Sequence, residues 1–533
     1  MHALMFTLSL LAGCGDTESG TAGSDPTVQP PSVVQADAPR MNVVFVLWDT
    51  VRADRMSLYG HSRPTTPALE AFAKDATVYE AAWSPGMWTL PSHASMFTGL
   101  PPATHGANAS HRWLDHHHTT LAELLSADGY DTFAFSSNLI ASPMANLMQG
   151  FQTVHTTLPR QGAKRGRYTQ AARASTRAKL MPEDASTEVS PAFNGSNADK
   201  WEKAAFKDAG PVIVQGFGEW LDERDSDKPF FAYLNLMEAH TPRIPSAASR
   251  DTLLDDEVRS LGLKTDVSLF KENTFIVGKH EYSEAELEAI RGVYDATLLD
   301  LDKATAALFA DLKQRDLLDE TLFILVSDHG ESLGEHRMLE HRWAIHEPLL
   351  NVPLVVRWPG VLKPGRVEQP VSTIDLYATI LDATGVEAPD NSGTRSRSLR
   401  DGASAAPIYA QMVDPFASQL KSIRNAYPEL DLSTWTRTYS TVRDADLKYV
   451  RISDGAHALF DLSADPGEDA NALKARAADG ERLHALLEAW ESGLVPYDPA
   501  KRRPKEGAAQ QNDEERAMLQ ALGYAEPDDE DGN

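Results

Sequence analysis

The sequence predicts an α/β fold, in which helices sandwich a mostly parallel central sheet, with a small C-terminal α+β domain. Three observations indicate it. Continuous apolar, β-branched runs at 42–48 and 321–326 are typical of strands buried on both faces of a sheet. Segments with helical spacing, such as 283–317, alternate with these runs, and this alternation favours a parallel sheet. From about residue 407, short strands and turns replace it, and a helix is expected at 479–492.

Length and composition fit one large domain and a smaller one. Of the 533 residues 42% are apolar, which is enough for a sizeable core. The net charge of −27 argues against a nucleic-acid partner, because phosphate binding needs clustered Lys and Arg. We expect a catalytic domain at 41–400 with an insertion at about 152–211, and a C-terminal subdomain at 401–500. A tail at 501–533, with a disordered acidic end, would follow.

The N-terminal segment carries the one cysteine of the chain, Cys14, so that no intramolecular disulfide can form. Cys14 ends the string LAGC after a short apolar run, which resembles a bacterial lipoprotein signal with a lipidated cysteine. The alternative is a free thiol in an ordinary signal peptide. Residues 15–40 are rich in Gly, Ser, Thr, Pro and Asp, as in a flexible tether. We therefore expect a protein of the bacterial cell envelope, attached to a membrane only through lipid.

Polar residues follow several of the expected strands. Asp49 and Thr50 come directly after the strand at 42–48, in a place where α/β folds put their ligands. A helix N-cap is the alternative role for Asp49. Further strands are expected at 130–136, 229–236, 321–326 and 352–358. Asn138, His240 and the pair Asp328 and His329 lie just beyond three of these strands.

The stretch WTLPSHASMFTG places a hydroxyl residue, Thr89, at the start of a helix. Pro91 suits the first helical turn, where its missing N–H costs nothing. A hydroxyl beside the free N–H groups of a helix N-terminus is a suitable seat for a phosphate or sulfate group. The alternative is an ordinary helix capped by Thr or Ser.

Neighbouring strand ends would bring these groups together. Carboxylate and imidazole side chains from Asp49, Asp328 and His329 could hold a divalent ion beside the Thr89 hydroxyl. Such an ion lowers the pKa of a hydroxyl nucleophile and holds a non-bridging oxygen of an ester. His240 or a later histidine, His341, could donate a proton to the leaving oxygen.

With these residues in view, the chain resembles the sulfatase family of the alkaline-phosphatase-like superfamily. The resemblance runs from about residue 42 to 473, apart from the insertion. It rests on the order of six strings: VFVLWDTVRADRMSLYG, TLPSHASMFTGLPPATHG, VSDHGESLGEH, NVPLVVRWPG, VSTIDLYATILDATG and LFDLSADPGEDAN. Together they are far more specific than any one of them.

The resemblance implies a divalent metal ion, with calcium, manganese and zinc as candidates, and an anionic ester substrate. By position it implies metal ligands at Asp49, Asp328 and His329, with Thr89 as nucleophile and further ligand. Thr50 stands where the family usually has a second acidic ligand, and His93 where it has an arginine, which makes His93 a catalytic candidate. His240 matches the substrate histidine. The motif that carries the family's Lys and His reads FSSNLI here, which leaves Asn138 as a substrate-binding candidate. His341 and Arg342 replace the late lysine, with His341 as a catalytic and Arg342 as a substrate-binding candidate.

Thr89 changes the chemistry that the resemblance implies. Sulfatases oxidise Cys or Ser to formylglycine, and Thr cannot form that aldehyde hydrate. A phospho-threonine can be released by attack at phosphorus, so a phosphate ester or diester is favoured over a sulfate ester. The leading hypothesis is a metal-dependent ester hydrolase with a covalent Thr intermediate. An envelope transferase of phospho-alcohol head groups and a non-catalytic binding protein on the same fold are the alternatives.

Overall fold

The computed structural model describes residues 40–158, 166–180, 207, 209–224, 227–262, 264–389, 393–400, 402 and 405–501. The predictions for the signal peptide and Cys14, for the tether up to residue 39 and for the tail beyond 501 lie outside the described residues, as does most of the insertion. Among the described helices, none combines the length and the apolar character needed to cross a membrane.

The predicted α/β architecture is confirmed. In the described chain, nine strands form one sheet in the order β10-β2-β9-β6-β1-β5-β3-β4, with β11 beside β2. The pairs of β1 with β5 and β6, and of β3 with β4 and β5, are parallel; β9 is antiparallel to both of its neighbours. These nine strands are β1 (Asn42–Trp48), β2 (Thr77–Trp83), β3 (Asp131–Ser136), β4 (Thr153–Thr156), β5 (Phe230–Leu236), β6 (Thr321–Val326), β9 (Asn351–Arg357), β10 (Gly365–Val367) and β11 (Val371–Ser372).

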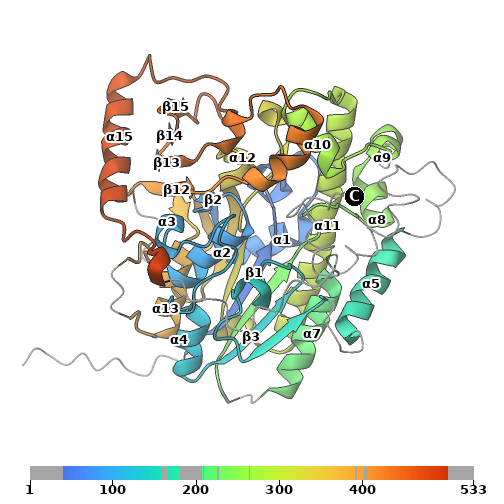
Figure 1. Cartoon of the computed structure of the whole chain (residues 1–533). Helices are drawn as coiled ribbons and strands as arrows, with labels where there is room; N and C mark the ends of the chain where they lie inside the picture. Colours follow the sequence, from blue (N-terminus) through green and yellow to red (C-terminus); the bar gives the residue numbers. More distant parts are fainter. Residues whose placement is uncertain are drawn as a thin grey trace, which may run out of the picture. The chain divides into compact units, whose positions relative to one another are not determined.

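Helices cover both faces of this sheet, with α5, α7 and α11 to one side of the strands and α2, α4 and α13 to the other (Figure 1). The long α11 packs against α1, α7, α8 and α9, whereas α13 packs against α2 and α4. The described α-helices are α1 (Pro67–Phe72), α2 (Thr89–Thr98), α3 (Pro102–His105), α4 (Leu121–Ala127), α5 (Arg167–Leu180), α7 (Gly210–Glu223), α8 (Ala247–Leu253), α9 (Asp256–Gly262), α10 (Leu269–Ile276), α11 (Glu284–Gln314), α12 (Glu347–Leu350), α13 (Asp375–Thr384), α14 (Lys421–Ala426) and α15 (Ala477–Ser492).

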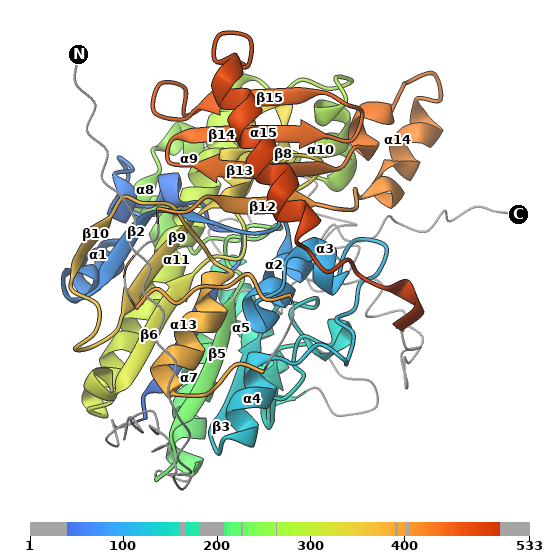
Figure 2. The ribbon, with the colours of Figure 1, turned by 90° about the vertical axis from the view of Figure 1, so that its left-hand side faces the viewer.

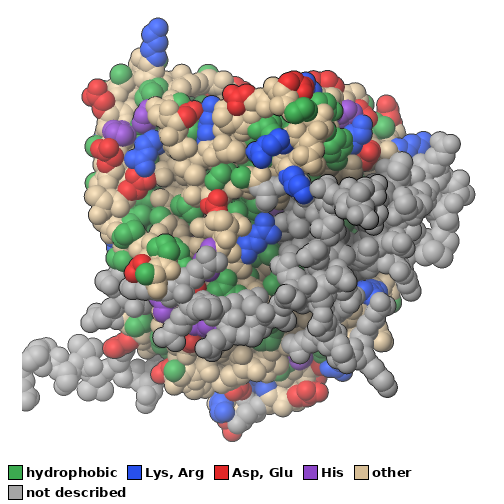
Figure 3. Space-filling model, viewed as in Figure 1, with side chains coloured by type: hydrophobic (Ala, Val, Ile, Leu, Met, Phe, Trp, Pro, Cys, Tyr) green, Lys and Arg blue, Asp and Glu red, His purple; other side chains and the backbone are tan. Residues whose placement is uncertain are grey.

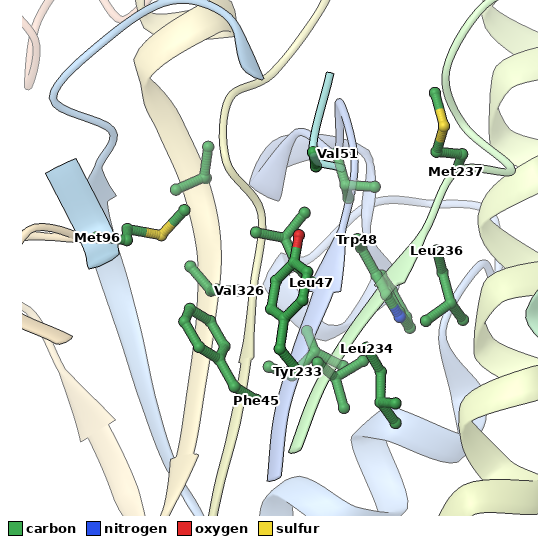
Figure 4. Packing of buried hydrophobic residues seen from close by; sticks show 14 of the residues in the cluster. Phe45, Leu47, Trp48, Val51, Met96, Tyr233, Leu234, Leu236, Met237 and Val326 are labelled. Carbon is green, nitrogen blue, oxygen red and sulfur yellow. The ribbon is translucent and has the colours of Figure 1, made fainter. Parts of the chain in front are cut away.

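The core lies on both faces of β1, whose seven residues are all buried. Its side chains alternate between the faces: Figure 4 shows Phe45 with Tyr233 on the side of Met96, and Trp48 with Leu236 on the other. The Phe45 ring meets the ring of Tyr233 edge to face at 5.9 Å. Each large side chain buried in this way contributes roughly 1.5–3 kcal/mol, so the central strands form a rigid support for whatever follows them.

The register of the central strands decides where the site lies. Trp48 pairs with Leu236 of β5, and Leu47 pairs with Val326 of β6. Ser136 at the end of β3 pairs with Asn235. Four strands therefore end at one edge of the sheet, and the residues that follow them share that edge.

The C-terminal part forms the small antiparallel sheet that the sequence predicts. Its order is β12-β13-β14-β15, and α15 packs on β13 and β14 (Figure 2). The strands are β12 (Ile408–Met412), β13 (Tyr439–Asp444), β14 (Leu447–Ile452) and β15 (His457–Asp461). Buried side chains such as Trp83 and Ile345 join it to the large domain. On the face in Figure 3, acidic and basic side chains are interspersed.

The structure adds elements that the pattern did not predict. β2 and β13 were not expected, and the segment predicted as an insertion begins with β4, an edge strand of the main sheet. Its helix α5 packs against α7. A short hairpin, β7 (Ser332–Leu333) with β8 (Leu339–Glu340), lies between β6 and β9.

Candidate active site

The strand ends bring Asp49, Asp328 and His329 into one group. Each offers a ligand atom, and these atoms lie within 4.8 Å of one another. All three side chains are 0% exposed. The predicted metal ligands thus meet, as the strand register requires.

Each of the two carboxylates has one oxygen held by the protein. Oδ2 of Asp49 accepts hydrogen bonds from Nδ2 of Asn138 at 2.6 Å and of Asn235 at 3.3 Å. Oδ1 of Asp328 accepts from the backbone N–H groups of Thr50 at 3.2 Å and His329 at 3.0 Å. Among the described residues, no hydrogen bond reaches Oδ1 of Asp49. Oδ2 of Asp328 lies 3.4 Å from Nε2 of His329 and 3.5 Å from Nδ1 of His93, and the Thr89 hydroxyl bonds to the Asp328 carboxylate.

Burial makes this pair of carboxylates costly to ionise. It raises the pKa of Asp49 to about 7, with a further contribution from the charge of Asp328, and it raises the pKa of Asp328 to about 7. A buried carboxylate oxygen without a donor is normally matched by a cation. The two oxygens and the imidazole form a mixed donor set that suits a divalent ion.

His329 is oriented toward Thr89. Its Nδ1 donates to the carbonyl oxygen of Gly330 at 2.9 Å, so Nε2 carries the lone pair. This Nε2 lies 3.4 Å from Oγ1 of Thr89. Burial lowers the pKa of His329 to about 4, so the ring is neutral and able to act as a ligand.

Thr89 is the first residue of α2 and is fully buried. Trp88 occupies the N-cap position and its side chain makes no capping bond, so the alternative of a Thr or Ser cap is wrong. The N-cap alternative for Asp49 is wrong as well, because Thr50 takes a left-handed conformation, with φ of 61°, before any helix begins. That conformation is uncommon for a β-branched residue, and it aims the Thr50 N–H at Asp328.

His93, predicted as a catalytic residue, serves the helix start. Its Nδ1 donates to the carbonyl oxygen of Thr89 at 2.8 Å, and its Nε2 accepts from the Tyr233 hydroxyl at 2.6 Å. The side chain is 0% exposed, and burial lowers its pKa to about 3. These contacts show a neutral histidine that fixes the carbonyl of Thr89.

Asn138, predicted to bind substrate, contacts Asp49, one of the predicted metal ligands. Its Nδ2 donates to Asp49, and its Oδ1 accepts from the backbone N–H groups of Ile140 at 2.7 Å and Ala141 at 3.2 Å. Both Nδ2 and Oδ1 of the Asn138 amide are therefore hydrogen-bonded to protein groups. Asn235, a polar residue inside the apolar strand β5, contacts the same carboxylate, and sequence reasoning did not select it.

The two remaining histidines lie on the other side of His329. The ring centroids of His341 and His329 are 4.4 Å apart, and those of His341 and His240 are 5.2 Å apart. Nδ1 of His240 donates to the carbonyl oxygen of Thr241 at 2.6 Å. Nδ1 of His341 lies 3.2 Å from Oε1 of Glu331. Both predicted histidines therefore join the site.

A buried charge network, which the sequence did not predict, surrounds these histidines. Glu331 faces Arg243 at 2.7 Å, and Glu340 lies 3.5 Å from Arg342 and 3.7 Å from Arg243. Glu331 and Arg243 stand in the strings SDHGES and HTPR, two residues beyond His329 and three beyond His240, which is the only signal the sequence offered.

Arg342 belongs to this network. It donates to Oδ1 of Asn273 at 2.7 Å and lies 3.8 Å from Glu272. Its contacts are with protein groups, and the side chain is 3% exposed. The predicted substrate contact of Arg342 stays untested.

Burial separates the proton affinities of Glu331 and His341. It raises the pKa of Glu331 to about 8, with help from the charge of Glu340, and lowers the pKa of His341 to about 4. Oε1 of Glu331 and Nδ1 of His341 lie 3.2 Å apart, within reach of a direct proton transfer.

The family described as Sulfatase matches residues 41–386, and the one described as N-sulphoglucosamine sulphohydrolase, C-terminal, matches 334–489. Arylsulfatase K of Bos taurus is 26% identical over 467 residues, which cover 82% of this chain and 78% of that protein. The multifunctional alkaline phosphatase superfamily protein PehA of Trinickia caryophylli is 24% identical over 485 residues, covering 81% and 91%.

A solved structure shares the fold. The phosphonate monoester hydrolase of Agrobacterium radiobacter superposes with a TM-score of 0.64 at 21% identity, over 87% of this chain and all of that one. The family match covers well over half of the 533 residues. The strand-end group and the matches agree, and the chain belongs to the sulfatase family of ester hydrolases.

Proposed function

We propose that the protein is a metal-dependent hydrolase of phosphate or sulfate esters that works through a covalent Thr89 intermediate, with a phosphate ester or diester as the favoured substrate. The single observation that carries this proposal is the position of the Thr89 hydroxyl. It lies 3.4 Å from Nε2 of His329 and at the start of a ten-residue helix. Beside it are the buried carboxylates of Asp49 and Asp328, and Oδ1 of Asp49 accepts no hydrogen bond from described residues.

The residues present fit a divalent ion. Asp49 and Asp328 each keep one oxygen bonded to protein donors and turn the other toward the site, and His329 is oriented by Gly330 as metal-binding histidines usually are. Oγ1 of Thr89 would complete the set. A bound ion would supply positive charge at the nucleophile and at the substrate's non-bridging oxygens. The imidazole ligand favours manganese or zinc over calcium.

The reaction takes two displacements at phosphorus. Oγ1 of Thr89 forms a bond to phosphorus while the bond to the leaving alcohol breaks, and the hydroxyl proton of Thr89 is lost to water. The alcohol oxygen takes the proton of Nε2 of His341, while Nδ1 of His341 takes a proton from Oε1 of Glu331. In the second step water forms a bond to phosphorus while the bond between phosphorus and Oγ1 of Thr89 breaks. One proton of that water goes to Nε2 of His341, whose Nδ1 returns a proton to Oε1 of Glu331, and Oγ1 of Thr89 takes its proton back from water. The N-terminal end of α2, where the helix dipole is positive, would favour the developing charge.

Phosphate is favoured because of what Thr89 lacks. A threonine cannot provide the aldehyde hydrate by which formylglycine expels sulfate, whereas a phospho-threonine is open to attack at phosphorus. The similarity to a phosphonate monoester hydrolase and to a multifunctional member of the superfamily supports this choice. Because the chain is also similar to arylsulfatase K, a sulfate ester must be assayed beside the phosphate esters.

The experiment is a substrate panel run on the purified, metal-loaded enzyme. Aryl sulfate, phosphate monoester, phosphate diester and phosphonate substrates are each assayed with calcium, manganese and zinc. We expect turnover of a phosphate ester or diester with manganese or zinc. Strong turnover of the aryl sulfate alone would overturn the phosphate preference, and no turnover of any substrate would favour a binding protein on this fold.

We further propose that Cys14 anchors the protein in the bacterial cell envelope. Support comes from the string LAGC after an apolar run and from the tether-like composition of 15–40. Labelling with radioactive palmitate in cells should mark the wild-type protein and spare the Cys14→Ser variant. Equal labelling of both, or of neither, would contradict this proposal.

A further inference from the structure

Beyond the strand-end group, the structure contains a second buried group of titratable side chains around His341. Ligand atoms of Glu331, Glu340 and His341 lie within 4.8 Å of one another, and all three side chains are buried. Such a group could be a second metal site or part of the catalytic machinery. The surroundings decide between the two.

Two arginines oppose a cation there. Arg243 lies 2.7 Å from Oε2 of Glu331 and 3.7 Å from Glu340, and Arg342 lies 3.5 Å from Glu340. Both guanidinium groups are nearly fully buried. Neither oxygen of Glu340 accepts a hydrogen bond from described residues, but a divalent ion here would meet two positive charges in a low-dielectric interior. The arginines already supply the charge that opposes the carboxylates.

We propose that Glu331 is a positioning residue for His341, held in place by Arg243, and that the three form a relay, Arg243–Glu331–His341, that aims Nε2 of His341 at the leaving oxygen. This inference rests on the proposed function, which makes His341 the proton donor. Both oxygens of Glu331 are used: Oε1 faces Nδ1 of His341 at 3.2 Å and Oε2 accepts from Arg243 at 2.7 Å. With Nδ1 engaged, Nε2 is the nitrogen that exchanges a proton with substrate.

The backbone of Glu331 is fixed from both sides. Its N–H donates to the carbonyl oxygen of Pro348 at 3.0 Å, and its own carbonyl oxygen accepts from Arg52 at 3.0 Å. Gly330, just before it, passes so close to Pro348 that a Cβ would lie 1.9 Å from the Pro348 oxygen. Glu331 therefore has little freedom to move away from His341.

Arg243 links the relay to the other histidine. Its Nε donates to the carbonyl oxygen of Ala239, the residue before His240, at 3.2 Å, and its guanidinium lies over the ring of Tyr294 at 5.4 Å. One rigid cation therefore fixes Glu331 and the turn that carries His240. A lysine in place of Arg243 could not make both contacts, since its ammonium group is a single point charge on a flexible stem.

The test compares two substrates in one enzyme preparation. Glu331→Gln keeps the shape of the side chain but offers only one oxygen. Because Arg243 only donates, the amide would turn that oxygen to Arg243 and its NH2 group to Nδ1 of His341. Nδ1 of His341 then faces an amide that cannot give up a proton to it, in place of the carboxyl group. We expect turnover of an alkyl phosphate, whose leaving group needs a proton, to fall about 100-fold, as the loss of a general acid commonly gives. Turnover of a 4-nitrophenyl phosphate should fall less than about 3-fold, because the nitrophenolate leaves without a proton.

The ratio of the two activities makes the result independent of folding, since a misfolded fraction reduces both alike. Glu272→Gln is the matched control: it removes a buried carboxylate that pairs with Arg342 in the same network, and it should change both activities by one factor. An equal loss on both substrates in Glu331→Gln would overturn the inference. His341→Gln tests the proposed acid separately. If His341→Gln lowers turnover of both substrates equally, His341 is not the acid and the proposed function is wrong on this point. If His341→Gln lowers turnover of the alkyl phosphate more, but Glu331→Gln does not, the positioning role of Glu331 is wrong.

Discussion

Asp49→Asn should stabilise the metal-free protein at pH 8 while it abolishes metal binding. The carboxylate of Asp49 is buried beside Asp328, and its pKa is raised from 3.8 to about 7. One pKa unit corresponds to about 1.4 kcal/mol, so holding this group ionised in the fold costs up to about 4 kcal/mol. Part of that cost comes from Asp328, and we expect a gain of about 2–4 kcal/mol from the neutral amide.

The pH dependence follows from the sign of the shift. The folded pKa lies above the unfolded one, so between pH 4 and 7 the folded protein binds more protons than the unfolded chain. The carboxyl group therefore costs nothing below about pH 4, and its cost is complete above about pH 7. The advantage of Asp49→Asn should be absent at pH 4, grow through this window and level off at pH 8.

The assay is urea unfolding of chelator-treated wild type and Asp49→Asn at pH 5 and pH 8, repeated with added manganese or zinc. A metal at 100 times its dissociation constant stabilises the wild type by about 2.7 kcal/mol and should leave the variant unmoved. The difference in unfolding free energy between Asp49→Asn and the wild type should then become smaller or change sign. A metal-free variant that is no more stable than the wild type at pH 8, or one that metal still stabilises, would refute the reasoning.

Two further predictions concern the same strand ends. Thr89→Ala should lower turnover by roughly a thousandfold or more, as loss of a covalent nucleophile commonly does. Steady-state kinetics measure this, and turnover near that of the wild type would show that Thr89 is not the nucleophile. Asn138→Ala should weaken metal affinity about 10–100-fold, because Asn138 holds the Oδ2 atom of Asp49 at 2.6 Å. Metal titration followed by calorimetry measures it, and an unchanged affinity with a raised KM would instead make Asn138 a substrate ligand.

The central sheet and the strand-end group of Asp49, Asp328 and His329 were predictable because both depend on short-range patterns. Continuous apolar runs marked β1 and β6, and residues that follow parallel strands must share an edge, which located Asp49, Asp328 and His329. β2 was missed: its sequence, TVYEAAW, mixes alanine and glutamate into the strand, and its burial comes from packing against distant elements.

The orientation of individual side chains was not predictable. His93 stands one helical turn after Thr89, but whether it faces the substrate or the Thr89 carbonyl depends on Tyr233, which is 140 residues away. The pairing of Glu331 with Arg243 spans 88 residues and needs the loop after β5 to meet the loop after β6. The spacing of residues along the chain cannot predict contacts between residues so far apart in the sequence.

The most direct test of the covalent mechanism is mass spectrometry of the enzyme quenched in acid during turnover of a 4-nitrophenyl phosphate ester. The account predicts a phosphoryl group on the peptide that contains Thr89, absent from Thr89→Ala treated in the same way. A phosphorylated residue elsewhere, or turnover by an enzyme that never carries phosphate on Thr89, would contradict it.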